Sequence, residues 1–334
     1  MAAVDVGAST GRKGGYRPSQ SEIVLGFTLL LFIVLSVSLQ GFLTLGNLFT
    51  LARGVSILGI MALGMAVVVI GRGIDLSQVA TLAVSAAIGA TLVNAGYSAV
   101  FGFGVGLLLA IAIGMANGFL VSVIEIPPLF TTLASGLLAL GVTRALVVPH
   151  YQVFLEPGHD TFLMLGGNIA GGLPVPVIVF AVCAVLLHLF LSRTVLGRFI
   201  YAHGDNAQAA RLSGMATRPL TMLEYALCSA IGYVGGVVML ASTSLIDLQI
   251  AESTVIFDVI LVVVLGGVSL VGGRGNVASV IAGTLLIGVL LNAMTIMNLD
   301  VQTQDIIKGA VLLIAIVVDS WAHPRDEETA KQGD

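Results

Sequence analysis

The chain has 334 residues, of which 57% are hydrophobic and only 10% are charged, and its formal net charge is −4. A soluble domain carries roughly 25% charged residues, so this composition excludes a water-soluble globular protein and indicates a chain that lies in lipid. The small net charge gives no indication of a nucleic-acid partner.

Ten apolar stretches follow one another along the chain. A membrane-spanning helix needs about 20 mostly apolar residues, within a range of roughly 17–25. The spacing predicts an all-α, polytopic membrane protein with about ten transmembrane helices, in one domain at 23–320 between tails at 1–22 and 321–334. The stretch at 76–93 also fits a re-entrant or buried segment, because it is rich in small residues. The predicted helices cover 23–39, 54–70, 76–93, 97–124, 129–148, 175–191, 220–241, 255–270, 277–297 and 306–318.

The positions of Lys and Arg predict the orientation. If the N-terminus lies inside and ten spans alternate, only Arg53, Arg144 and Lys308 fall outside, and Lys308 is expected to snorkel toward the headgroups. Such a bias is the positive-inside pattern, so we expect both tails in the cytoplasm. The basic residues on the inner side are Arg12, Lys13, Arg17, Arg72, Arg193, Arg198, Arg211, Arg218, Arg274, Arg325 and Lys331.

The chain lacks the usual sequence signatures of ATP binding and metal catalysis. A P-loop needs Lys followed by Ser or Thr after a glycine-rich turn, but Lys13, Lys308 and Lys331 are followed by Gly, Gly and Gln. No His, Asp or Glu cluster has metal-ligand spacing. We therefore expect no catalytic residue, metal or cofactor in this chain.

The carboxylates of the apolar stretches lie close to the predicted ends of those stretches. Ion-coupled transporters usually place such groups deep in the membrane, where their cost marks them as functional. The pattern therefore favours an energy source in another subunit over proton or sodium coupling. These carboxylates are Glu125, Glu224, Asp258, Asp305 and Asp319, each within about one turn of a predicted end.

The longest inner loop, 193–218, contains signals for a short helix. Asp205 or Asn206 is a suitable N-cap for a helix over 207–212, and Gly214 can end it in the left-handed conformation. Pro219 suits the first turn of the next membrane helix. The small alanines of 207–210 would let this helix enter a groove on another protein. An amphipathic loop on the headgroups is the alternative.

Four motifs in this order resemble those of the ribose/galactose/xylose-type ABC permeases. Residues 197–215 resemble the coupling loop of that family, and 127–133 read Pro-Pro-Leu-Phe-Thr-Thr-Leu. Residues 71–77 match a Gly-Gly-Ile-Asp-Leu-Ser motif with Arg72 intervening as a departure, and 266–275 read Gly-Gly-Val-Ser-Leu-Val-Gly-Gly-Arg-Gly. Ile256-Phe257-Asp258 replaces the usual Glu-Leu-Asp, which leaves the transported sugar open.

The resemblance implies one subunit of an importer in the bacterial cytoplasmic (inner) membrane. Such permeases form homodimers or heterodimers, dock on a cytoplasmic ATPase that binds ATP and Mg, and receive a monosaccharide or related polyol from a periplasmic sugar-binding protein. A permease for branched-chain amino acids or nucleosides, and an ion-coupled secondary transporter, are the alternatives. The residues implied for coupling to the ATPase are Gly197, Arg198, Gly204, Asn206, Ala209, Ala210, Arg211 and Gly214.

A sugar path needs hydrogen-bonding groups that hold the substrate weakly. Asn117 and Asn292 also fit hydrogen bonds between helices, because an amide inside a bilayer must find a partner. Asp75 also fits a cap for the third segment. The candidates for the translocation path are Asp75, Ser77, Asn94, Asn117, Thr131, Thr132, Ser269 and Asn292.

Overall fold

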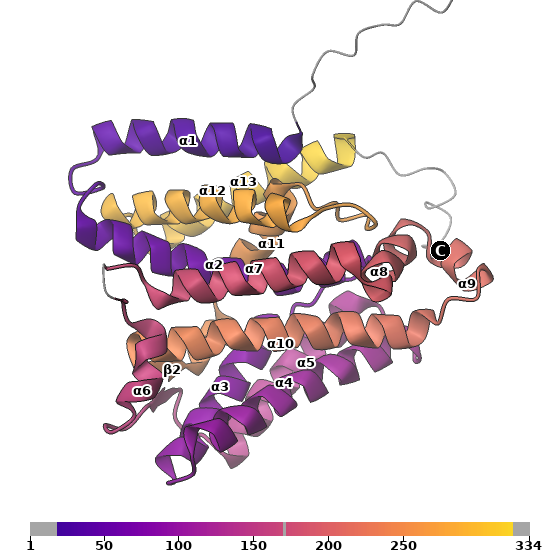
Figure 1. Ribbon diagram of the computed structural model, residues 1–334, viewed down its shortest axis with the longest axis horizontal. Coiled ribbons are helices and arrows are strands. Elements are labelled where there is room, and N and C mark those ends of the chain that lie inside the picture. Colours follow the sequence, from indigo (N-terminus) through magenta and orange to yellow (C-terminus); the bar gives the residue numbers. More distant parts are fainter. Residues whose placement is uncertain (1–18, 170–171, 323–334) are drawn as a thin grey trace, which may run out of the picture.

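The computed structural model describes residues 19–169 and 172–322, and the main helices in these ranges run roughly along one direction (Figure 1). Each of the ten predicted stretches overlaps one helix. These helices are α1 Gln20–Ser38, α2 Leu45–Ile70, α3 Gln78–Asn94, α4 Ala99–Ser122, α5 Pro128–Leu146, α7 Val175–Arg193, α10 Thr217–Thr243, α11 Val255–Gly266, α12 Val277–Ile296 and α13 Val301–Ala322.

Seven helices in the described part of the chain are long and apolar enough to cross a membrane: α1, α2, α4, α5, α7, α10 and α12. The fold is therefore that of a polytopic membrane protein, as the composition predicts. Whether α3, α11 and α13 also cross, and hence the count of ten, stays a prediction.

Short elements join the long helices at both ends of the bundle. At one end, β1 Gln152–Phe154 pairs antiparallel with β2 Leu245–Asp247, next to α6 Asp160–Leu163, and the 3-10 helix η1 Met164–Gly166 follows α6. The 3-10 helix η2 Leu248–Glu252 follows β2 and packs against α3. At the other end, α8 Val195–Asp205 and α9 Ala207–Leu212 form the predicted coupling loop.

The start of α1, the end of α13 and the α8–α9 loop lie at the same end of the bundle, opposite α6 and β2 (Figure 1). This arrangement agrees with two tails on the same side as the coupling loop. Which side faces the cytoplasm, and the domain limits at 22 and 321, stay predictions. Five of the predicted inner basic residues lie outside the described residues: Arg12, Lys13, Arg17, Arg325 and Lys331.

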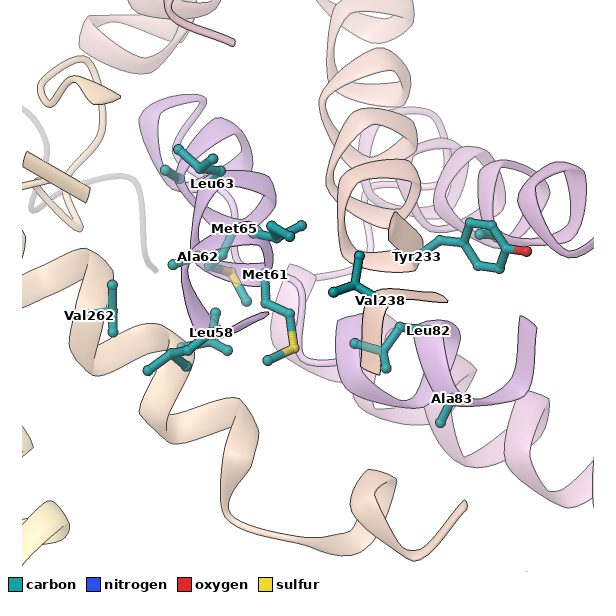
Figure 2. Close-up of a cluster of buried hydrophobic side chains, with 14 of the residues drawn as sticks. Leu58, Met61, Ala62, Leu63, Met65, Leu82, Ala83, Tyr233, Val238 and Val262 are labelled. Carbon is teal, nitrogen blue, oxygen red and sulfur yellow. The ribbon is translucent and has the colours of Figure 1, made fainter. Parts of the chain in front are cut away.

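The core is built around α2, which is buried from Val55 to Ile70 except at the half-buried Ile57. Figure 2 shows its Leu58, Met61 and Met65 near side chains from three other helices: Leu82 of α3, Val238 of α10 and Val262 of α11. Helices α1, α4, α5 and α7 instead expose apolar side chains, the surface expected against lipid or another membrane subunit.

Two predictions about the last part of the chain are wrong. The stretch 255–270 is not one long helix, because α11 has only 12 residues and is therefore about 18 Å long, and Gly267 ends it with φ +103°. Lys308 does not snorkel, because α13 begins at Val301, well before the predicted start at 306. Its side chain is only 12% exposed and lies between two carboxylates.

Candidate coupling site and polar core

The predicted coupling loop contains one more helix than its sequence indicated. Thr194 Oγ1 accepts a hydrogen bond from the Gly197 amide at 3.0 Å and so caps α8. Gly197, Ile200 and Gly204 form the buried face of α8, while Arg198 is exposed. These three positions repeat with the period of a helix, and that spacing in the sequence is the signal that could have predicted α8.

The second helix, α9, has the predicted caps. Asn206 Oδ1 accepts a hydrogen bond from the Ala209 amide at 2.9 Å, and Gly214 has φ +80°, which confirms both assignments. Ala210 faces its own chain and is buried, whereas Ala209 and Arg211 are exposed. Leu212 is 90% exposed. The outward face of α9 therefore presents an apolar side chain that the motif comparison did not single out.

The C-terminal end of α8 lies directly against two other segments of the backbone. The Gly273 amide donates a hydrogen bond to the Ile70 carbonyl at 2.8 Å, and a Cβ at Gly204 would overlap that carbonyl oxygen. The Tyr201 hydroxyl donates to the Gly275 carbonyl at 2.8 Å. The coupling loop thus meets the end of α2 and the glycine-rich turn 267–275, which sequence motifs alone did not place together.

A buried polar pair connects α8 to α10. His203 Nδ1 lies 3.3 Å from Glu224 Oε1, and Glu224 is 1% exposed. A Cβ at Gly71 would overlap the Glu224 carboxyl group, so the end of α2 also contacts this pair. Glu224 is the eighth residue of α10. The predicted helix start at 220 made it only the fifth residue, so Glu224 lies deeper in its helix than expected.

Arg72, the departure from the family motif, lies in the turn after α2. Its φ of +75° belongs to the left-handed region, which glycine adopts at little cost. Arg72, which intervenes between the two glycines of the resembled motif, therefore holds a backbone conformation that favours glycine. Arg72 also lines a cavity of about 210 Å³ together with Glu125, His203 and Glu224.

Four of the predicted path residues, Asp75, Ser77, Asn117 and Thr132, lie together around the 71–77 turn. The Ser77 hydroxyl donates to Asp75 Oδ1, and Asn117 Nδ2 donates to Ser77 Oγ at 2.8 Å. Thr132 Oγ1 accepts from the Leu76 amide at 3.1 Å. All four side chains are fully buried. They tie the 71–77 turn to α4 and α5, so in this conformation they connect helices.

The other predicted path residues lie elsewhere. Asn94 donates to the Phe154 carbonyl at 2.7 Å and thereby holds the 149–174 loop. Asn292 exchanges two hydrogen bonds, 2.8 and 3.0 Å long, with Asn47 of α2. Ser269 is buried in the 267–275 turn, and Thr131 is buried at the start of α5. The eight candidates therefore do not form a single site.

The described residues form a bundle of apolar helices with a helical loop that packs onto one end of it through glycines, which is the architecture of a polytopic membrane protein. A family model described as "Branched-chain amino acid transport system / permease component" matches residues 47–316. The chain belongs to this family of permease components. Permease components of ABC importers work with an ATPase and a binding protein, so membership in this family implies partners of these two kinds.

Curated relatives cover nearly the whole chain. The ribose import permease protein RbsC of Escherichia coli (strain K12) is 33% identical over 87% of this chain and 91% of the relative. RbsC of Bacillus subtilis (strain 168) is also 33% identical, over 87% and 89%. The L-arabinose ABC transporter permease protein AraH of Azospirillum brasilense is 31% identical over 91% and 88%. No solved structure matches the chain.

Proposed function

We propose that this chain forms half of the translocation pathway of an ABC importer for a monosaccharide or a related polyol. The observation that carries the proposal is the likeness to ribose and arabinose permeases along about nine-tenths of both chains. The family description mentions branched-chain amino acids, but these relatives carry pentose names, which favours a sugar.

The importer would lie in the bacterial inner membrane and contain three further parts. A second permease subunit, either identical or related, would complete the path. A cytoplasmic ATPase would bind ATP and Mg, and a periplasmic binding protein would deliver the sugar. This chain itself would hold no cofactor and catalyse no reaction.

The coupling loop gives this function a mechanism. The ATPase would hold α9, whose outward face presents Leu212 and Ala209. A movement of α9 would reach the end of α2 through the contact between Gly204 and the Ile70 carbonyl, and α10 through His203 and Glu224. Nucleotide binding shifts the conformational equilibrium only as far as its affinity differs between the two conformations.

Uptake by reconstituted vesicles tests the proposal. Vesicles that contain the permease, its ATPase and its binding protein are expected to accumulate labelled D-ribose, L-arabinose or another monosaccharide only when ATP is supplied. ATP-driven accumulation of leucine without any sugar uptake would contradict the sugar assignment. Uptake by the permease alone that collapses with an uncoupler would instead identify an ion-coupled secondary transporter.

A further inference from the structure

A charged cluster between α11 and α13 is not used by the coupling mechanism. Lys308 Nζ lies 3.0 Å from Asp305 Oδ1 and 3.3 Å from Asp258 Oδ1, and it donates to Thr254 Oγ1 at 2.8 Å. Asp305 also accepts from Thr254 at 3.0 Å. Two carboxylates around one ammonium group leave a formal charge of −1 at this place.

The cluster lies inside the bundle, about 6 to 11 Å along α13 from its start at Val301. Asp258 lines a cavity together with Val55 and Leu58 of α2 and Gly288 of α12. Val55 and Leu58 are central in the 26-residue α2, roughly 15 to 23 Å from either end at 1.5 Å per residue. The short α11 begins beside this cavity, because its first residue Val255 and Ile250 of η2 also line it. Ionisable groups at such a depth are costly, and as a rule they line a substrate or ion pathway.

The cluster is open on one side of the chain. Asp305 is 35% exposed, and the adjacent Phe257 is 49% exposed. A charged side chain this exposed does not face hydrocarbon without a large cost. The face between α11 and α13 must therefore border water or another polar surface, such as that of a second permease subunit.

The side chains around the opening have the chemistry that binds a polyhydroxylated ligand. Asp258 is nine-tenths buried, and its Oδ1 pairs with the Lys308 ammonium group at 3.3 Å but accepts no hydrogen bond among the described residues, so a ligand hydroxyl that reaches the cavity can donate to its remaining lone pair. Asp305 provides further acceptors, and Lys308 and Thr254 provide donors. Phe257 presents an aromatic ring to the C–H face of a sugar. Together with Leu261, Gly309 and Leu312, these five residues line a cavity of about 260 Å³, near the lower end of small-molecule sites.

We propose that this cavity is a subsite on the translocation path that binds the hydroxyl groups of the passing sugar. The proposal rests on the proposed sugar-import function. Asp258 and Phe257 are the residues that contact the sugar, and Lys308 holds the two carboxylates close together. Phe257 stands where the resembled family has Leu, while Asp258 keeps the family's Asp, so Phe257 makes this subsite a candidate determinant of which sugar passes.

Chemical labelling tests whether the subsite borders water, whatever the substrate is. In a background of Cys183→Ser and Cys228→Ala, Phe257→Cys is compared with Leu186→Cys, an exposed apolar position on α7. A membrane-impermeant maleimide is added to membranes that contain the assembled importer. We expect Phe257→Cys to react at least about tenfold faster, because a thiol in lipid does not ionise. Equal rates would overturn the proposal.

Sugar uptake tests the binding role, with D-ribose and L-arabinose as the probes. Asp258→Asn is expected to lower ATP-driven uptake about tenfold, the effect of losing one charge-assisted hydrogen bond. Phe257→Ala should also lower it, whereas Phe101→Ala, an exposed aromatic on α4, should not. Membrane abundance and ATPase capture should match wild type. Unchanged uptake in both variants would overturn the proposal.

A charge-swapped variant separates substrate binding from a purely structural ion pair. Asp258→Lys combined with Lys308→Asp keeps the pair but moves the carboxylate, so we expect uptake to stay low. Full recovery of uptake would overturn the proposal. If wild-type vesicles take up neither sugar, the proposed function fails for these sugars, while the labelling rates still decide whether the cluster borders the path.

Discussion

Replacing Gly204 by Ala should disconnect the coupling loop from the core. The new Cβ would overlap the Ile70 carbonyl oxygen and press on the Gly273 amide, and no rotamer change can relieve a clash with backbone atoms. Overpacking costs about 1–3 kcal/mol, and loss of the Gly273–Ile70 hydrogen bond adds about 1 kcal/mol. Together these costs favour a state in which α8 has moved away from α2.

The assay compares three quantities for Gly204→Ala and wild type: membrane abundance, capture of the ATPase, and ATP-driven uptake. We expect capture to persist, because the outward face of α9 is unchanged, while uptake falls at least about tenfold, corresponding to 1.4 kcal/mol or more. Gly141→Ala is the matched control, because a Cβ there meets no atom within 4 Å. Wild-type uptake by Gly204→Ala would refute the contact as a transmission route.

Three further changes test other contacts. Leu212→Glu should abolish most ATPase capture while membrane abundance stays normal, because it places a charge on the exposed face of α9; unchanged capture in a pull-down would contradict the role of that face. Asn292→Ala should destabilise the fold by about 1–3 kcal/mol, because it removes both hydrogen bonds between Asn47 and Asn292, and a thermal-unfolding assay should show Asn47→Leu with Asn292→Leu to be less harmful than the single change. Glu224→Gln should weaken the link to His203 and lower uptake more than ATPase capture, as measured in the same vesicles; equal losses of both would show that the pair only maintains the loop's structure.

Local features of the chain were predictable from sequence because local interactions determine them. The ten apolar stretches, the Asn206 cap and the left-handed Gly214 depend on neighbours within a few residues. Contacts between distant segments were not predictable in this way. No periodicity indicates that Gly204 meets Ile70, or that Asn292 pairs with Asn47.

The candidate site shows the same limit. A list of polar residues in apolar stretches found Asp75, Ser77, Asn117 and Thr132, which do come together. It missed the α11–α13 cluster, because the predicted helix began at 306, beside Lys308. The helix α13 actually begins at Val301, seven residues before Lys308. Hydropathy finds a helix by its apolar part, so a polar first turn escapes it.

The glycine contacts at Gly71 and Gly204 have a mechanical consequence. A long side chain between two helices takes up a small displacement by changing its rotamer, so little of the displacement reaches the second helix. At Gly204 the main chain of α8 lies directly on the main chain that ends α2, and neither has torsions free to yield. A small shift in the loop is therefore passed directly to the end of α2.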